Sequence, residues 1–542
     1  MPTISVSIRD LKSLLSQDIP TSQLIEILPL NKISIVEAVG DELRLEVTPD
    51  RPDLFSPEGI ARQLDYWMEF RQGFQEFKVL PPEVQVFSKD VQSRPSIVAG
   101  AIRNLSLNYD AIKSLMQLQE FLDLTLGRDR KKISIGIHDM GRLHPPFYYK
   151  EVFPGTISFV PLGMDKKMNL REILKSHPKG MKYRHLLSGK KFPILLDSQN
   201  QTLSFPPIIN GELTKVTEST KDIFIDITGY DTTPMNYALN ILVTALEKRG
   251  GKIESVVVNG KTYPHLSPRN IKIDFSEVRS VLGINEKDSQ ITGLLKRMGY
   301  GYDQMAKNIL IPPYRTDILH HADLIEDIAI AFGFNNFIPE VPRHHSIGKP
   351  DKLEEFSNLL RHLLAGLGFQ EVINFTLVSS SNLFKKMNLE PQAAAEIRNP
   401  ISNEYGICRV SIIPSLLENL SSNKHRRYPQ KIFEVADCIE IDPKEETRTK
   451  NMRRLGFAIS YHRADFSDLL SYLNAIKENL GISFGLENAS HNSYIPGRCG
   501  SVLLAGKNIG IFGEIHPSVL ANWDLEKPVI AFEVEVWPLM KK

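Results

Sequence analysis

Hydrophobic and polar residues alternate along this chain in short blocks that switch between strand and helix periodicity. The first 85 residues are predicted to form a small α/β unit, with a strand, a helix and a strand at 4–8, 10–17 and 42–49. Ser56 is the predicted cap of a helix over 57–66 that has proline at its first position. The proline-containing loop before this helix, 48–55, is interpreted as structural.

The next segment, residues 91–260, has the pattern of one larger α/β domain. Residues 80–90 include a Pro-Pro pair and are predicted to be the linker in front of it. The domain is predicted to contain a long helix that opens at Thr233 and closes at Gly250. Its strands are predicted at 133–137, 205–212 and 222–229.

These predicted strands end in polar side chains. One stops at Asn210 and Gly211, and another places Asp226 and Thr228 on the same face, because side chains alternate along a strand. An acid and a hydroxyl at a strand end can line a polar pocket, and they can equally hydrogen-bond nearby backbone. Asp226 with His138 suggests acid–base chemistry, but the sequence has no GxSxG, P-loop or GxGxxG signature beside them.

Residues 268–345 are predicted to form a compact, helix-rich unit that ends in an acidic helix. This helix places Asp323, Glu326 and Asp327 on one face by their three- and four-residue spacing, and Asp317 lies just upstream. The opposite face is apolar, as expected for a helix on a core. Mg2+ would relieve repulsion among these carboxylates. The alternative is an exposed helix N-terminus that happens to be acidic, where the helix dipole relieves part of the repulsion.

The last segment, residues 351–542, is predicted to be a further α/β domain. It starts with a helix at 354–369, and the alternation at 432–441 and 531–537 is typical of antiparallel strands with one covered face.

Composition narrows the class of protein. The chain has 542 residues, enough for three to four domains, and its 65 basic and 64 acidic residues argue against a general nucleic-acid coating. Its three cysteines are far apart, which indicates neither a zinc site nor a disulfide framework and fits a reducing cytoplasm. No signal peptide and no apolar run near 18 residues is found, so we expect no membrane association.

Several of these segments, taken in order, resemble one known family. The segments read RPDLFSPEGIAR, SIGIHD, FPPIINGE, DIFIDITG, PPYRTDI with DLIEDIAIAFGFNN, IRNPIS with SLLENL, and GEIHPSVL. Each is weak alone, but seven in sequence resemble the phenylalanyl-tRNA synthetase beta-subunit family in its shorter archaeal and eukaryotic form.

The resemblance implies an α+β multidomain fold and a set of partners. Its domains would be an N-terminal α/β domain, an editing domain of the B3/B4 type, a B5-like domain and a class II synthetase-like domain without catalysis, at 1–85, 91–260, 268–345 and 351–542. The implied complex is an (αβ)2 heterotetramer in the cytoplasm. Its alpha subunit attaches phenylalanine to tRNA(Phe) with ATP, and this chain alone would not aminoacylate. The matching positions Arg398 and Arg409 are expected to be relics of the fold or interface residues.

The resemblance also implies two sites. The editing domain would hydrolyse tyrosine mischarged onto tRNA(Phe), with Glu212 on the tyrosine hydroxyl and Asp226 and Thr228 on the ammonium and the water; the pocket positions are Asn210, Gly211, Glu212, Asp226 and Thr228. A Mg2+ ion shared with the alpha subunit would be held by Asp317, Asp323, Glu326 and Asp327. The alternatives are a scaffold that does not edit and a tRNA-binding protein built from the same domains.

Overall fold

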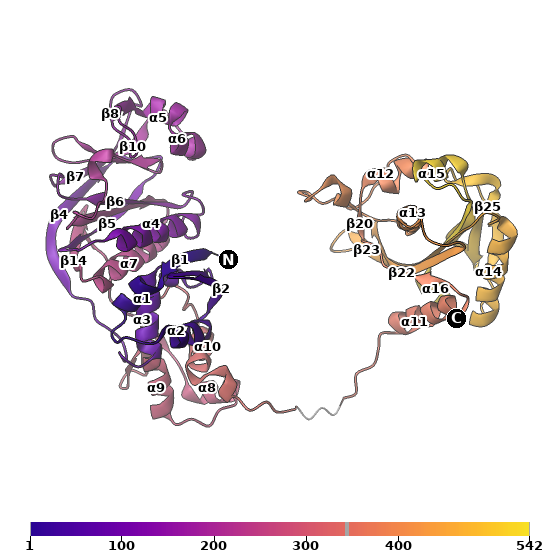
Figure 1. Ribbon diagram of the computed structural model, residues 1–542, viewed down its shortest axis with the longest axis horizontal. Coiled ribbons are helices and arrows are strands. Elements are labelled where there is room, and N and C mark those ends of the chain that lie inside the picture. Colours follow the sequence, from indigo (N-terminus) through magenta and orange to yellow (C-terminus); the bar gives the residue numbers. More distant parts are fainter. Residues whose placement is uncertain (1, 342–345, 541–542) are drawn as a thin grey trace. The chain divides into compact units, whose positions relative to one another are not determined.

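The computed structural model describes residues 2–341 and 346–540, and its chain divides into two compact units, Met1–Val341 and Pro342–Lys542 (Figure 1). Each unit has its own sheets and core. The α+β multidomain class predicted from the sequence is confirmed. The parts of the predicted domains that fall on residues 1, 342–345 and 541–542 lie outside the described residues.

The first unit begins with a three-stranded antiparallel sheet in the order β1-β3-β2. Its strands and the two helices beside it are β1 Thr3–Ser7, α1 Ile8–Leu14, α2 Thr21–Ile27, β2 Ile33–Val39 and β3 Glu42–Val47. The predicted strands at 4–8 and 42–49 and the predicted helix are confirmed. Strand β2 was not predicted, because most of its side chains are exposed and its alternation is weak.

Helix α3, Pro57–Trp67, connects three parts of the first unit, and all eleven of its residues are buried. The Ser56 hydroxyl accepts a hydrogen bond from the Gly59 amide (3.3 Å), so the predicted cap is confirmed. On one side the Gln63 amide donates to Asn31. On the other, the Arg62 guanidinium lies 4.5 Å from the centre of the Tyr314 ring.

A ten-stranded mixed sheet forms the centre of the first unit. Along the sheet the strand order is β12-β11-β10-β7-β4-β14-β5-β13-β6, with β15 paired to β14. The strands are β4 Val79–Lys89, β5 Ser96–Arg103, β6 Ile133–Asp139, β7 Phe147–Val152, β10 Phe192–Leu196, β11 Thr202–Phe205, β12 Ile209–Asn210, β13 Ile223–Gly229, β14 Lys252–Val258 and β15 Lys261–Tyr263. Helix α7, Thr232–Lys248, packs on β5 and β13, and helix α4, Tyr109–Leu124, packs on β6.

Two predictions about this sheet are wrong. The proposed linker at 80–90 is strand β4, which pairs in parallel with β7 and β14 inside the sheet, so no domain boundary lies at 85–91. Its Pro-Pro pair at 81–82 falls where the pairing with β14 is interrupted, so the missing N–H groups cost no ladder bond. The predicted single strand 205–212 is a hairpin in which β11 turns through Pro206 and Pro207 into β12.

Between β7 and β10 the chain forms a series of short helices and strands. They are β8 Ser158–Phe159, β9 Met168–Asn169, α5 Leu170–Ser176, α6 Pro178–Tyr183 and the 3-10 turn η3 Arg184–Leu186. Figure 1 shows β8, α5 and α6 together at the end of the first unit that carries β10.

The remainder of the first unit is the helix-rich part expected after residue 268. A small antiparallel sheet, β16-β18-β17, packs with three helices. Its elements are β16 Arg269–Lys272, α8 Phe275–Leu282, α9 Asp288–Arg297, β17 Gly301–Asp303, β18 Asn308–Ile311 and α10 His321–Phe332. In α10 Leu324, Ile325 and Ile328 are buried, as predicted, and the helix ends at Gly333 with φ of 92°.

The second unit is built on a seven-stranded sheet in the order β19-β22-β23-β27-β26-β25-β24, antiparallel except at β19–β22. Its strands are β19 Gln370–Glu371, β22 Gln430–Ile441, β23 Thr449–Ser460, β24 Gly485–Asn488, β25 Tyr494–Leu504, β26 Lys507–Ile515 and β27 Val529–Glu535. The strands predicted at 432–441 and 531–537 are confirmed. The helices are α11 Lys352–Gly366, α12 Ser380–Leu383, α13 Ile413–Ser422, α14 Phe466–Leu480, α15 Pro517–Asn522 and α16 Val536–Met540, and a separate pair joins β20 Leu377–Val378 to β21 Ile407–Cys408.

Candidate functional site

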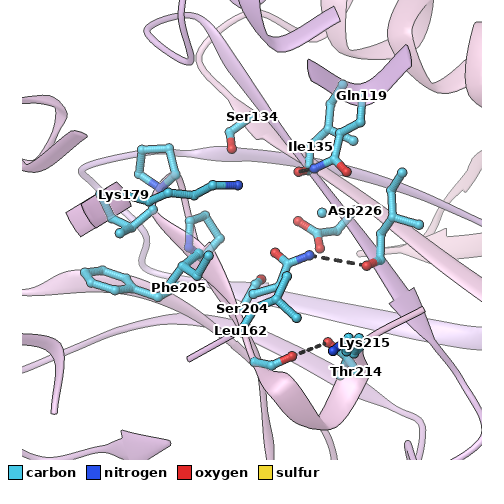
Figure 2. A pocket seen from close by; sticks show the side chains of 18 of the residues that line it. Gln119, Ser134, Ile135, Leu162, Lys179, Ser204, Phe205, Thr214, Lys215 and Asp226 are labelled. Carbon is cyan, nitrogen blue, oxygen red and sulfur yellow. Dashed lines mark hydrogen bonds between the residues drawn. The ribbon is translucent and has the colours of Figure 1, made fainter. Parts of the chain in front are cut away.

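A cavity of about 420 Å³ opens where the two ends of the large sheet, β12 and β6, come close together. This volume is within the range of small-molecule sites. Its walls are mostly apolar and come from α4, β6, the β11–β12 hairpin and the loop after β8. Figure 2 shows polar groups of Ser134, Lys179, Ser204 and Asp226 around the same space. A mainly apolar hollow with a few converging polar groups is typical of a ligand site.

Asp226 is fixed on the floor of the cavity by His138. Its Oδ1 lies 2.7 Å from His138 Nε2, and His138 Nδ1 lies 2.8 Å from the Thr214 hydroxyl. An ionised carboxylate only accepts hydrogen bonds, so Nε2 donates to Asp226. Asp226 Oδ2 has no hydrogen-bond partner within residues 2–341 and 346–540, which leaves one carboxylate oxygen for a ligand.

Gly136 makes room for this pair. It lies opposite Asp226 in the β6–β13 ladder, and a Cβ at this position would be 2.3 Å from Asp226 Oδ1 and 2.7 Å from His138 Nε2. Both distances are far inside van der Waals contact. Only glycine at position 136 therefore leaves the Asp226–His138 hydrogen bond intact.

Ser204 and Asn210 supply further polar groups from the hairpin. The Ser204 hydroxyl is buried on the cavity wall and has no hydrogen-bond partner among the described residues. The Asn210 amide nitrogen donates to the Ile137 carbonyl at 3.2 Å, which joins the hairpin to β6. A buried hydroxyl without a partner costs stability, and Ser204 combines this feature with a place in the cavity lining.

Arg130 holds the hairpin from the turn after α4. Its Nη1 donates to the carbonyls of Pro207 and Ile208, both at 3.1 Å, and its Nε lies 3.2 Å from Asp123 Oδ2. The turn has three consecutive residues in left-handed backbone conformation, 128–130. Burial raises the pKa of Asp123 to about 7, against the opposing effect of Arg130. Arg130 thus sets the shape of the cavity wall from a strained turn.

The predicted pocket residues divide into two groups. Asn210, Gly211 and Asp226 line the cavity. Thr228 does not: its hydroxyl accepts a 3.0 Å hydrogen bond from Arg94, and it is completely buried. Glu212 is also outside the lining, because its carboxylate accepts from the Gly163 amide at 2.7 Å and pairs with Lys215.

Sequence reasoning missed Ser204 and Lys179, and it noted His138 beside Asp226 without including it among the pocket residues. Ser204 is a polar residue in the otherwise apolar run of β11, which is the signal that could have identified it. Lys179 comes from α6, and no local pattern relates this helix to β13. His138 touches Asp226 directly, so it positions a residue of the cavity although it is fully buried.

Two of the four acidic residues around α10 converge on a buried arginine, and the other two do not join them. The Asp317 carboxylate accepts hydrogen bonds from both Nε and Nη2 of the buried Arg315, at 2.9 and 2.6 Å. Asp327 accepts from the same Nη2 at 2.6 Å and from the Tyr300 hydroxyl at 2.5 Å. Burial opposes ionisation of Asp317, but Arg315 outweighs it and holds the pKa of Asp317 well below its usual value of 3.8.

The other two carboxylates have separate partners. Asp323 accepts from the backbone amides of Leu319 and His320, at 2.7 and 2.8 Å, and so caps its own helix. The exposed Glu326 lies 3.1 Å from Lys32. In the described ranges, no group of three or more His, Cys, Asp or Glu residues is placed to hold a metal ion. Asp323, Glu326 and Asp327 do lie three and four residues apart on α10, but within this chain their carboxylates have different partners, and the Mg2+ site stays a prediction.

Arg315 and Asp317 have a counterpart in the N-terminal part of the unit. Arg51 donates Nε and Nη2 to Asp53 at 2.9 and 2.8 Å, with the same Arg-x-Asp spacing and the same two-point geometry. The predicted structural role of this loop is supported by that pair. Arg51 and Arg315 are both buried, so each depends on its carboxylate.

In the second unit Arg409 is a structural residue. It is buried, and its Nη2 donates to Glu434 at 2.8 Å. Its guanidinium is therefore held inside the protein. Among the described residues, none of the helices has the length and apolar character needed to cross a membrane.

Comparisons with known proteins relate the whole chain to one family. Residues 338–536 match the family model described as "Phenylalanyl tRNA synthetase beta chain CLM domain", and residues 271–334 match the "tRNA synthetase B5 domain". Among curated relatives named "Phenylalanine--tRNA ligase beta subunit", that of Methanococcus maripaludis is 40% identical over 554 residues, covering 99% of this chain and 100% of the relative. That of Methanocaldococcus jannaschii is 40% identical, covering 99% of this chain and 100% of the relative. That of Thermococcus sibiricus is 39% identical, covering 100% of this chain and 99% of the relative.

A solved structure of an N-terminal fragment, about as long as the first unit, is also similar to this chain. An N-terminal fragment of the phenylalanyl-tRNA synthetase beta subunit from Pyrococcus horikoshii is 35% identical, with a TM-score of 0.59, and covers 61% of this chain and 100% of the fragment.

Proposed function

The chain belongs to the phenylalanine–tRNA ligase beta-subunit family, and on this premise we propose that it works beside an alpha subunit and also removes tyrosine from mischarged tRNA(Phe). The ligase reaction joins phenylalanine to tRNA(Phe) and converts ATP to AMP and diphosphate. The alpha subunit performs this chemistry. Full-length identity near 40% to curated beta subunits is the observation that supports the ligase role.

The second unit is proposed to be a class II synthetase-like domain that has lost catalysis and binds the alpha subunit. Its buried Arg409–Glu434 pair supports a structural use of the arginine. Ile373, Phe375 and Ile401 are large apolar side chains that are exposed in this unit. Exposed apolar side chains of this size fit a protein partner. Assembly into an (αβ)2 heterotetramer in the cytoplasm is part of the proposal.

Editing is proposed for the cavity of the first unit, within a domain of the B3/B4 type. A hydrophobic pocket that selects phenylalanine discriminates only about 10²-fold against an isostere that adds a hydroxyl. A second pocket solves this problem if it hydrogen-bonds that hydroxyl. The unpartnered Ser204 hydroxyl and the open oxygen of Asp226 are the groups that support this role.

We assign roles to these groups as follows. Ser204 hydrogen-bonds the tyrosine hydroxyl, and the open oxygen of Asp226 binds the ammonium of the aminoacyl ester. Asn210 and Gly211 shape the wall against which the ester lies. Glu212 and Thr228 act indirectly, by holding Gly163 and Arg94.

We assign the attack on the ester to a positioned water molecule. His138 is fully buried and already bonded at both ring nitrogens, so it keeps Asp226 in place and does not reach the ester. The pocket therefore positions the ester and a water molecule, and the hydroxyls of the tRNA terminus assist. A Mg2+ ion shared with the alpha subunit through Asp317, Asp323, Glu326 and Asp327 stays a prediction for the assembled complex.

The test is coexpression with the alpha subunit, followed by assays of phenylalanine charging and Tyr-tRNA(Phe) hydrolysis. We expect both activities in the complex and no charging by this chain alone. Charging by the isolated chain would contradict the proposed division of labour. Asp226→Ala should abolish Tyr-tRNA hydrolysis and leave charging intact; hydrolysis at the wild-type rate would exclude the cavity as the editing site.

A further inference from the structure

The short elements between β7 and β10 carry an excess of positive charge, unlike the chain as a whole. Basic and acidic residues almost balance overall, at 65 and 64. Residues 164–191, here called the basic segment, instead contain nine Lys and Arg and only two acidic residues, Asp165 and Glu172. The nine are Lys166, Lys167, Arg171, Lys175, Lys179, Lys182, Arg184, Lys190 and Lys191.

These cations face solvent and are not neutralised by the protein. All except Lys179 are exposed. Within the described parts of the chain, none of the nine forms an ion pair with a carboxylate, and Glu172 instead caps α5 through the backbone of Asn169. Lys182 and Lys191 lie over the rings of Tyr183 and Phe153, at 4.8 and 5.1 Å. A cluster of unpaired cations on a nearly neutral protein is kept at an electrostatic cost that a polyanionic partner would remove.

The basic segment reaches the cavity through α6. Lys179 lines the cavity, and Figure 2 shows its amine directed into that space on the side of Ser134. The Tyr183 ring lies 4.6 Å from the Arg130 guanidinium, which ties α6 to the residue that holds the hairpin. Burial lowers the pKa of Lys179, and Arg130 acts in the same direction, so a nearby anion would favour its charged form. The segment thus leads from open solvent to the edge of the proposed editing site.

We propose that the basic segment binds the phosphate backbone of the acceptor end of tRNA and guides its aminoacylated terminus into the cavity. The proposal rests on the proposed editing function, because that function makes an aminoacyl-tRNA the substrate. Lys and Arg that contact phosphates give sequence-independent, salt-sensitive binding. Lys179 is then a positioning residue for the terminal phosphates, and the exposed cations contact the strand further from the amino acid.

A matched pair of charge reversals in the complex with the alpha subunit tests the surface. One variant carries K166E, K175E and R184E. The control carries K252E, K261E and K272E, three exposed lysines of the same unit that also have no ion pair in the described residues. The measurements are KM and kcat for Tyr-tRNA(Phe) hydrolysis, and filter binding of uncharged tRNA(Phe), at several salt concentrations.

The first variant is expected to raise KM at least about tenfold at low salt, with kcat nearly unchanged and a shallower dependence of binding on salt. The control should stay near wild type, and phenylalanine charging should persist in both. Equal KM values in the two variants, or unchanged tRNA binding and KM in the first, would overturn the proposal. Binding to anionic lipid vesicles is measured as well. If the first variant lost binding to these vesicles while its binding to tRNA(Phe) stayed unchanged, the proposal would also be overturned.

Lys179 is tested separately. K179A should raise KM for Tyr-tRNA(Phe), K179R should restore it, and K179A should not weaken binding of tRNA(Phe) that lacks its 3′-terminal nucleotides. A change in kcat alone, or equal loss of binding with the shortened tRNA, would contradict the positioning role. If the wild-type complex does not hydrolyse Tyr-tRNA at all, the editing proposal fails, and the binding measurements still decide whether the basic segment contacts tRNA.

Discussion

Arg315 Nη2 lies 2.6 Å from Asp327 Oδ2, and both side chains are buried. The sequence places Asp327 on the acidic face of a surface helix, but the fold uses it to neutralise an internal guanidinium. Because Arg315 also binds Asp317, one cation serves two carboxylates. Two of the four expected metal ligands are thereby committed to structure.

Asp317→Asn is expected to lower the free energy of unfolding of the first unit by about 3–5 kcal/mol at pH 7, because it leaves a buried guanidinium short of one partner. Denaturant unfolding measures this loss. The control is Asp288→Asn, which removes an exposed 2.9 Å pair with Arg279 and should cost below about 1 kcal/mol. Similar losses in the two variants would contradict the structural role of the Arg315 pair.

The same carboxylate predicts sensitivity to acid. The folded-state pKa of Asp317 is below its unfolded value of 3.8, so its contribution to stability is present above pH 4. It is lost as the pH falls below about 4, because the unfolded chain then binds the extra proton. Unfolding measured from pH 7 to pH 2.5 should be less steep with Asp317→Asn than in wild type. Parallel profiles would show that Asp317 does not control this window.

Asp327→Asn is expected to destabilise the chain equally with Mg2+ and with EDTA, since its carboxylate serves Arg315 and Tyr300. Thermal unfolding of the isolated chain in both buffers checks this. We expect the wild-type midpoint to be independent of Mg2+ as well. A wild-type midpoint that rises with Mg2+ and an Asp327→Asn midpoint that does not would show that the chain holds the ion by itself.

Gly136→Ala is expected to reduce Tyr-tRNA hydrolysis by about 10²-fold and to leave phenylalanine charging unchanged, because the new methyl group displaces Asp226 and His138. Thermal unfolding should show a cost of about 1–3 kcal/mol for overpacking. Gly155→Ala is the control, since a Cβ there meets no atom within 4 Å. Full hydrolysis by Gly136→Ala in the folded complex would refute the assigned importance of the Asp226–His138 geometry.

Ser204→Ala is expected to weaken hydrolysis of Tyr-tRNA by roughly 3- to 10-fold, the value of one hydrogen bond to the tyrosine hydroxyl. Slow hydrolysis of Phe-tRNA, which lacks that hydroxyl, should not change. Ser460→Ala removes another buried hydroxyl without a partner, in the second unit, and should affect neither rate. If Ser204→Ala lowered both hydrolysis rates equally, Ser204 would not be the group that reads the hydroxyl.

The sequence predicted the elements that carry their own local signals. Helices α3 and α10 have a cap, an apolar face and a clear end, and β13 has strong alternation, so each was placed correctly. Strand β4 was missed because its Pro-Pro pair indicates a break, and only its neighbours β7 and β14 show how the sheet accommodates it.

The candidate site was only partly predictable, because hydrogen-bond partners are not encoded locally. Asp226 was singled out from the strand pattern and Asn210 from the family resemblance, and both line the cavity. Thr228 shares the face of Asp226, yet its hydroxyl is taken by Arg94, which is far away in sequence. Ser204 stands out only when the whole cavity is formed and no neighbour reaches it.

The complete burial of α3 has a practical meaning for anyone who wishes to express pieces of this chain. A cut between residues 85 and 91 would interrupt β4 and strip a helix of the Thr244 and Tyr314 contacts that cover it. Fragments ending there should aggregate or be digested, whereas a fragment ending near residue 341 keeps every partner of α3. Limited proteolysis should accordingly yield one long-lived N-terminal product in place of three small ones.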